Sequence, residues 1–169
     1  MNRALATFAL LSAACGGPSG PLTVEVAGEH LERLPAYLRA PGLEEHVREA
    51  AANMAAGWGG DPAALDGYVL TFEQLPFECG RAGAEAERIA GCTWESARVI
   101  QLLAWGSACV EASLLAHEVG HVVIGDNGHA DPRWRDRGFW DRMKTIAERT
   151  APGGCDLSRL ADHNEKHDD

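Results

Sequence analysis

The spacing of apolar residues along the chain predicts the strands and helices of one small α+β domain. Alternation over residues 22–26 and short apolar runs over 67–72 and 98–103 predict strands. Apolar residues three or four positions apart predict a helix over 43–58, which a cluster of glycines and a proline ends. Residues 78–93 follow neither pattern, so we expect a loop there.

A second helix, predicted over residues 107–123, is apolar around most of its circumference, so we expect it to be buried. Ser107 suits its N-cap, and Gly125 suits a left-handed residue that ends it. Gly120 costs the helix about 1 kcal/mol relative to Ala. Its presence is compatible with close packing against a neighbouring element.

A third helix is predicted over residues 136–150, with large apolar residues along one side and Pro152 after its end. The whole pattern indicates an α+β fold, in which a short mixed sheet packs on the buried helix 107–123 and a C-terminal helix follows. We assign this domain to residues 22–157. The acidic tail 158–169 has few apolar residues, so we expect it to be disordered.

The composition is that of a single globular domain with an acidic surface. The chain has 169 residues, of which 46% are hydrophobic, and a formal net charge of −10. Negative charge repels the phosphates of nucleic acids, and no cluster of Lys and Arg opposes it. We therefore expect no nucleic-acid partner, and we expect a monomer.

Residues 1–14 have the features of an export signal, since Arg3 precedes an apolar run that is too short to span a bilayer. The stretch Leu-Ser-Ala-Ala-Cys that ends at Cys15 resembles a bacterial lipoprotein cleavage box, although Ser12 replaces the large aliphatic residue that such boxes prefer. The resemblance implies lipidation of Cys15, a flexible tether over 15–21, and a bacterial cell-envelope protein whose lipid alone enters the membrane. The alternative is an ordinary secretory signal and a secreted protein.

Apart from Cys15 the chain has four cysteines, and an even number in an exported domain suggests two disulfides. Four cysteines allow three pairings. We favour Cys79–Cys92, which closes a short loop, and Cys109–Cys155, which ties the start of the buried helix to the far end of the chain. Zinc ligation by these thiols is the alternative, but no CxxC spacing supports it.

The stretch His117-Glu118-Val119-Gly120-His121 places two histidines and a glutamate on the predicted buried helix. Residues four apart lie on one face of a helix, so the imidazoles of His117 and His121 can bind the same metal ion. Glu118 then lies beside that ion, where a carboxylate can take a proton from a metal-bound water molecule. We therefore predict that His117 and His121 are metal ligands and that Glu118 is the catalytic residue.

A catalytic site of this type needs a third protein ligand and an open position for water. His129 is the first choice, because it comes eight residues after His121 and just past a glycine-containing turn. Glu148 on the last predicted helix is the alternative third ligand. The carboxylates of Asp126 and Asp131 are further candidates.

Residues 117–132, which read HEVGHVVIGDNGHADP, resemble the zincin metallopeptidases and especially their metzincin branch, whose extended motif is HExxHxxGxxH. Gly125 and His129 are displaced from that motif by one and two positions, and the Met-turn of the metzincins has no counterpart. The resemblance implies a zinc metallopeptidase with a peptide or protein substrate, in which Glu118 activates a zinc-bound water. The gluzincin branch completes its site with a glutamate, which in this chain would be Glu148.

Two other functions stay open at this point. A catalytically inactive zincin-like lipoprotein would act as a metal-binding or interaction module, and an arginine paired to Glu118 or the lack of a third ligand would indicate it. A zinc-binding or storage protein would instead have a metal site without an open coordination position.

Overall fold

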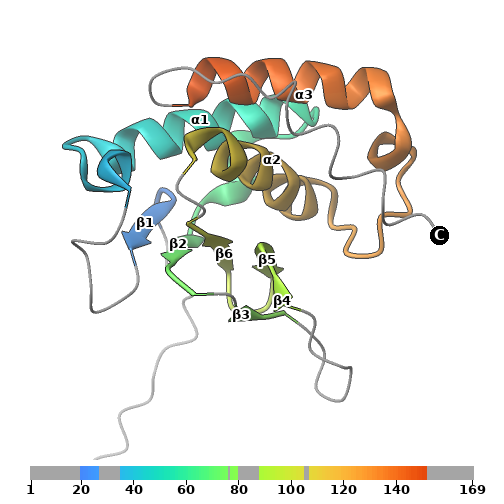
Figure 1. Ribbon diagram of the computed structural model, residues 1–169. Helices are drawn as coiled ribbons and strands as arrows, with labels where there is room; N and C mark the ends of the chain where they lie inside the picture. Colours follow the sequence, from blue (N-terminus) through green and yellow to red (C-terminus); the bar gives the residue numbers. More distant parts are fainter. Residues whose placement is uncertain (1–19, 27–34, 76, 80–87, 105–106, 152–169) are drawn as a thin grey trace, which may run out of the picture.

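The structure is a computed structural model of the chain (Figure 1), and it describes residues 20–26, 35–75, 77–79, 88–104 and 107–151. The expected signal peptide, Cys15 and the tail 158–169 lie outside the described residues. None of the described helices is long and apolar enough to cross a membrane.

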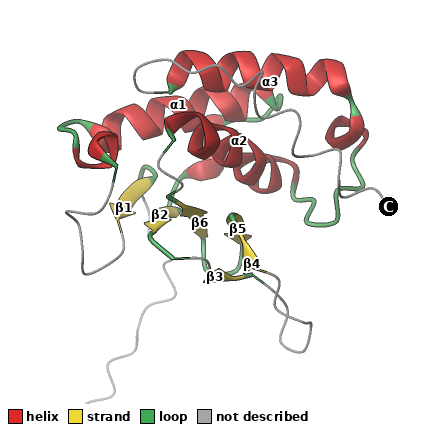
Figure 2. Ribbon diagram, in the orientation of Figure 1, coloured by secondary structure: helices red, strands yellow, loops and turns green. Residues whose placement is uncertain are grey.

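A mixed four-stranded sheet forms one layer of the domain (Figures 1 and 2). Its strands are β1 (Thr23–Val26), β2 (Val69–Glu73), β5 (Gly91–Trp94) and β6 (Val99–Leu103). They are arranged in the order β1-β2-β6-β5, with β5 antiparallel to β6 and the other two pairs parallel. A separate antiparallel pair consists of β3 (Phe77–Glu78) and β4 (Arg88–Ile89).

Three helices cover one face of this sheet: α1 (Leu43–Gly57), α2 (Ala108–Ile124) and α3 (Arg137–Thr150). Both α1 and α2 contact the strands, whereas α3 packs across these two helices. The predicted α+β fold, with a short mixed sheet on a buried helix and a further C-terminal helix, is confirmed. Each predicted helix and strand agrees with an observed element to within two residues at either end.

The hydrophobic core lies between the sheet and the helices. Leu70 pairs in register with Ile100, and Phe72 with Leu102, and none of these four side chains is more than 3% exposed. The same buried cluster includes helix residues at intervals of three and four: Val47, Ala50, Ala51 and Met54 on α1, Leu115 and Val119 on α2, and Phe139, Met143 and Ala147 on α3. The burial of this apolar surface, which contributes about 25 cal/mol per Å², holds the layers together.

The expectation of a loop over residues 78–93 is wrong at both ends, because Glu78 belongs to β3, Arg88–Ile89 form β4 and β5 begins at Gly91. A four-residue strand that starts with glycine is too short to show alternation in a sequence. Pairing with β6 determines it instead. Within the part of the chain that the structure describes, β6 is its only neighbour, so β5 is an edge strand.

One of the two predicted disulfides is present. Cys79, directly after β3, is bonded to Cys92 on β5, as predicted. The bond therefore ties the edge strand to the small second sheet. The other predicted pair, Cys109–Cys155, lies outside the described residues because it includes Cys155.

The sequence signals that define α2 agree with its structure at three positions. Ser107 occupies the N-cap, as predicted, although its hydroxyl makes no capping hydrogen bond. Gly125 ends the helix in the left-handed conformation, with φ of 66°, as predicted. Close packing at Gly120 is confirmed, because a Cβ atom there would lie 2.5 Å from the indole ring of Trp58.

Candidate metal centre

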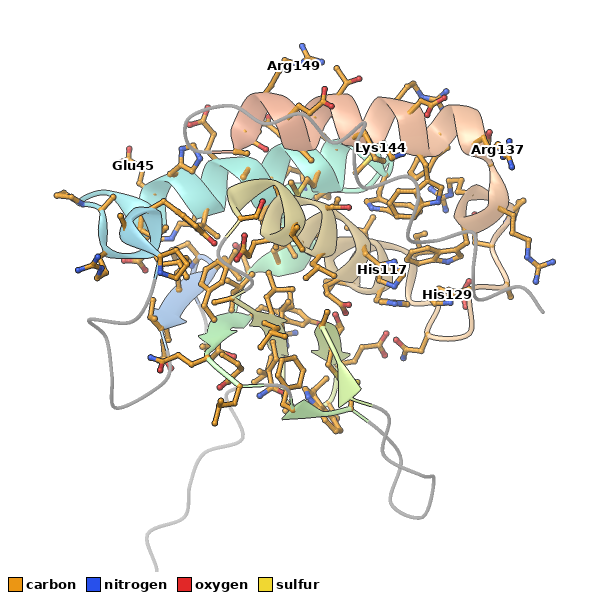
Figure 3. The ribbon with its side chains drawn as sticks, in the orientation of Figure 1. Glu45, His117, His129, Arg137, Lys144 and Arg149 are labelled. Atoms are coloured by element: carbon orange, nitrogen blue, oxygen red, sulfur yellow. A yellow bond between two sulfur atoms is a disulfide. The ribbon has the colours of Figure 1, made fainter. Side chains whose placement is uncertain are left out.

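Two turns of α2 and the loop that follows it bring three histidines together. The Nε2 atoms of His117 and His121 are 3.1 Å apart, and that of His129 lies 3.2 Å from the first and 3.3 Å from the second. Figure 3 shows His117 and His129 side by side, near the start of α3. The three rings could therefore hold one metal ion between them.

Hydrogen bonding among the rings cannot account for this triangle. Each neutral imidazole Nε2 atom is either a donor or an acceptor, so three such atoms in mutual contact always include one mismatched pair. A tetrahedral metal ion with imidazole ligands at about 2.0–2.1 Å requires nitrogen atoms that are about 3.3–3.4 Å apart. The observed spacings of 3.1–3.3 Å are close to that requirement. The donor set thus fits a shared ion.

Burial keeps two of the rings in the form that binds metals. Burial, with a smaller contribution from the neighbouring rings of His121 and His129, lowers the pKa of His117 to about 3. Burial also lowers the pKa of His121. Both rings are therefore neutral at neutral pH, and a neutral ring can offer a lone pair to a cation.

A backbone carbonyl fixes the tautomer of His121. Its Nδ1–H donates to the carbonyl oxygen of Asp126 at 2.7 Å, which leaves the lone pair on Nε2, facing the other two histidines. Metal-binding histidines in proteins nearly always have such a partner for their second ring nitrogen. The loop that leads to His129 therefore also orients His121.

The two aspartates considered as ligands have structural roles instead. The carboxylate of Asp126 accepts hydrogen bonds from the backbone of Gly128 and Asp131, and the Asp131 N–H holds its pKa below the usual range. Asp131 caps the 3₁₀ helix Pro132–Arg135 and forms a salt bridge with Arg133, whose hydrogen bonds lower its pKa to about 2. Neither carboxylate belongs to the histidine group.

The alternative third ligand, Glu148, is also not part of this group. Trp140, on the same helix, lies against His117, with 6.1 Å between the ring centroids. Glu148 follows Trp140 by eight residues, or about 12 Å along a helix axis. Among the described residues, the geometry favours His129 as the third ligand.

Glu118 follows His117 on α2 and is buried, with 4% of its surface exposed. Its Oε2 atom accepts a hydrogen bond of 2.8 Å from the Thr93 hydroxyl on β5. Burial raises its pKa to about 7, against the lowering effect of that hydrogen bond. Among the described residues no arginine or lysine forms a salt bridge with it. At neutral pH a group with this pKa can both accept and return a proton.

Two residues that support Glu118 are absent from the sequence-based prediction. Thr93 and Gly91 both belong to β5, which was expected to be a loop. A Cβ atom at Gly91 would lie 2.5 Å from Oε1 of Glu118, so glycine makes room for the carboxylate. No local pattern indicates either role, because the contact arises only when β5 and α2 pack together.

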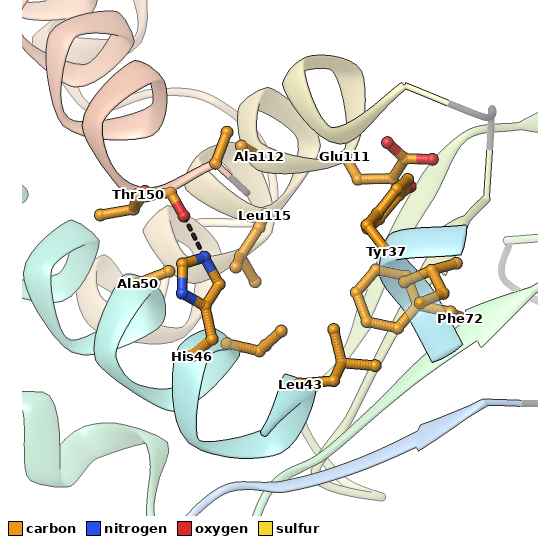
Figure 4. Close-up of a pocket in the computed structure, with 12 residues that line it drawn as sticks. Tyr37, Leu43, His46, Ala50, Phe72, Glu111, Ala112, Leu115 and Thr150 are labelled. Atoms are coloured by element: carbon orange, nitrogen blue, oxygen red, sulfur yellow. Dashed lines mark hydrogen bonds between the residues drawn. The ribbon is translucent and has the colours of Figure 1, made fainter. Parts of the chain in front are cut away.

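An apolar pocket elsewhere in the domain contains none of these site residues (Figure 4). It lies among α1, the first two turns of α2, β2 and the end of α3, and Tyr37, His46 and Glu111 are in its lining. The His46 side chain donates from Nε2 to the carbonyl oxygen of Thr150. The pocket is therefore separate from the histidine group.

The chain was also compared with known proteins. No protein family matches it, and neither a curated protein nor a solved structure is significantly similar to it.

Proposed function

We propose that the chain is a zinc peptidase in which His117, His121 and His129 bind Zn²⁺ and Glu118 is the general base. The observation that carries the proposal is the convergence of three imidazole Nε2 atoms at a helix on which Glu118, the residue directly after His117, is buried. Imidazole nitrogens in a tetrahedral arrangement suit zinc, and three of them leave the fourth position open. An open position favours catalysis over metal storage.

The residues of the chain then have distinct roles. Zinc would polarise a carbonyl group and lower the pKa of a water molecule. Glu118 takes the proton from the attacking water and later returns it to the leaving amine. The Thr93 hydroxyl engages Oε2 of Glu118, which leaves Oε1 to carry that proton. The carbonyl of Asp126 keeps the Nε2 lone pair of His121 available to the metal.

The edge strand β5 supports a peptide as the substrate. It pairs only with β6 among the described strands, so its other edge has backbone groups that an extended peptide can pair with. Gly91 and Thr93, on this strand, both approach the carboxylate of Glu118. A peptide added to this edge would bring its backbone carbonyl groups past the proposed base.

Activity with and without the base tests the proposal. The full chain, with His163 and His167 replaced by Ala so that the tail cannot bind metal, is loaded with zinc and assayed on a mixed peptide library. Glu118→Gln is expected to retain one zinc per chain and to lose at least about 100-fold in hydrolysis. The exposed Glu49→Gln is the matched control, with unchanged activity.

Three outcomes would contradict this proposal. Full activity in Glu118→Gln would show that Glu118 is not the general base. Loss of both zinc and activity in Glu118→Gln would indicate that Glu118 is needed for metal binding, and the general-base role would have no support. A fully zinc-loaded wild type that cleaves no peptide in the library would favour the inactive binding module.

We also propose that the protein is exported and lipidated at Cys15. The Cys79–Cys92 disulfide supports export, because disulfides persist in oxidising compartments. Expression in a bacterium with a labelled fatty acid should label the wild type and leave Cys15→Ala unlabelled. Release of an unlabelled wild type into the medium would identify a secreted protein instead.

A further inference from the structure

We propose that Trp134 and Asp126 are positioning residues that hold His129 in place against His117 and His121 before a metal ion binds. Neither residue has a ligand atom in the histidine group. The inference rests on the proposed metal site, but it does not depend on peptidase activity. Two observations support the inference: the Trp134 ring packs against the three histidines, and hydrogen bonds constrain the loop from Gly125 to Asp131.

The indole ring of Trp134 forms a floor beneath the metal centre. Its centroid lies 4.9 Å from that of His117, 4.8 Å from that of His121 and 4.5 Å from that of His129. Among the described aromatic rings, Trp134 alone contacts all three. A flat, rigid ring in this position restricts the orientations of all three imidazoles.

The floor is itself fixed by its neighbours. Trp134 packs on Trp58 at 4.5 Å between ring centroids, and a Cβ atom at Gly120 would lie 2.8 Å from the Trp134 ring. Trp140 donates its indole N–H to the backbone carbonyl of Trp134 at 2.9 Å. The close approach of Trp134 to α2 therefore depends on glycine at position 120.

Asp126 connects this floor to the loop. Its Oδ2 atom accepts from Nε1 of Trp134 at 3.1 Å and from the backbone N–H of Asp131 at 2.7 Å. Its Oδ1 atom accepts from the backbone N–H of Gly128 at 2.9 Å. These bonds lie on both sides of His129, so one carboxylate fixes the segment that carries the third ligand.

The backbone of His129 shows that this loop is constrained. Its φ of 54° lies in the left-handed region, which is unfavourable for residues other than glycine and persists only where the surroundings impose it. His129 is also exposed to solvent, so burial does not hold its ring. The bonds from Asp126 and the contact with Trp134 supply the constraint, and a preformed site loses less entropy when it binds a metal.

Metal titration of the full chain tests this inference, again with His163 and His167 replaced by Ala. Trp134→Phe keeps an aromatic floor but removes the N–H donor. Asp126→Asn replaces one of the two accepting oxygens with an amide nitrogen that cannot accept, so the side chain can no longer accept from Gly128, Asp131 and Trp134 together. Each is expected to weaken Co²⁺ and Zn²⁺ affinity by about 10–100-fold and to alter the visible absorption spectrum of bound Co²⁺. Because both changes act on the same network of hydrogen bonds around Asp126, the double variant should lose less than the product of the single losses.

Trp94→Phe is the matched control, because it removes an indole N–H that donates to Gln101 at 2.7 Å and is not part of the metal centre. It should leave the metal affinity unchanged. Weaker binding by Trp134→Phe and Asp126→Asn, at an unchanged Tm of the metal-free protein, supports the inference. Unchanged affinity in both variants, or losses that occur only because the metal-free protein unfolds, would overturn it. A wild type that binds no metal would overturn the proposed function instead.

Discussion

At the scale of single residues, Glu118 shows how burial can prepare a carboxylate for chemistry. Its side chain is enclosed between α2 and β5, with one oxygen bonded to Thr93. The cost of burying its charge raises its pKa to about 7. The same cost predicts a measurable dependence of stability on pH.

In the metal-free protein, Glu118 itself binds more protons in the folded state than in the unfolded state between pH 4.5 and about 7, because its pKa is raised on folding. Its contribution to stability is therefore lost as the pH rises through this range. Glu118→Gln removes this titration. The change in unfolding free energy that Glu118→Gln causes, relative to wild type, should therefore be more favourable at pH 8 than at pH 4.5 by roughly 1–3 kcal/mol.

Urea unfolding in the presence of a chelator measures this difference. The exposed Glu49→Gln should change the unfolding free energy by less than about 0.5 kcal/mol at either pH. An equal effect of Glu118→Gln at both pH values would show that the carboxylate is not buried as described.

The space at Gly91 gives a second prediction at this scale. Gly91→Ala would place a methyl group where Oε1 of Glu118 lies, so the carboxylate must move. We expect at least about a 10-fold loss of kcat with one zinc still bound per chain. Thr93→Ser, which keeps the hydroxyl that donates to Oε2, should retain activity. Wild-type kcat in Gly91→Ala would contradict the placement of Glu118 against β5.

At the scale of elements, α2 both fills the core and carries the site. Its periodic apolar residues and the spacing of His117 and His121 could be predicted because a helix fixes both locally. The short strand β5 could not be predicted from the sequence, because only its pairing with β6 defines it. For the same reason Asp126 was a candidate ligand in the sequence, whereas in the structure its carboxylate organises the loop.

The packing of α2 predicts a cost for a change that normally favours helices. Gly120→Ala gains about 1 kcal/mol of helix propensity, but its methyl group would overlap Trp58 and Trp134. We expect a net destabilisation of about 1–3 kcal/mol in denaturant unfolding. Gly138→Ala, on the exposed first turn of α3 with no contact shorter than 3.4 Å, is the matched control and should not destabilise. Equal effects of the two changes would exclude close packing at Gly120.

At the scale of the whole molecule, the site lies where three parts of the fold meet. The helix α2 supplies His117, Glu118 and His121, the loop between α2 and α3 supplies His129, and β5 contacts the carboxylate of Glu118, the proposed base. The layered core holds α2 against the edge strand. Trp58, at the end of α1, and Trp140, on α3, hold Trp134 beside the histidines. The proposed function is thus inferred from the place where α2, the loop that follows it and β5 meet.

The location of a bound zinc ion tests the central claim most directly. Crystals of the zinc-loaded chain should give one anomalous-scattering peak at the zinc absorption edge within the domain, at about 2.0–2.1 Å from Nε2 of His117, His121 and His129. A fourth position on the side of Glu118 should be free of protein ligands. A peak bound by Glu148 or by a cysteine, or no peak among the three histidines, would contradict the account.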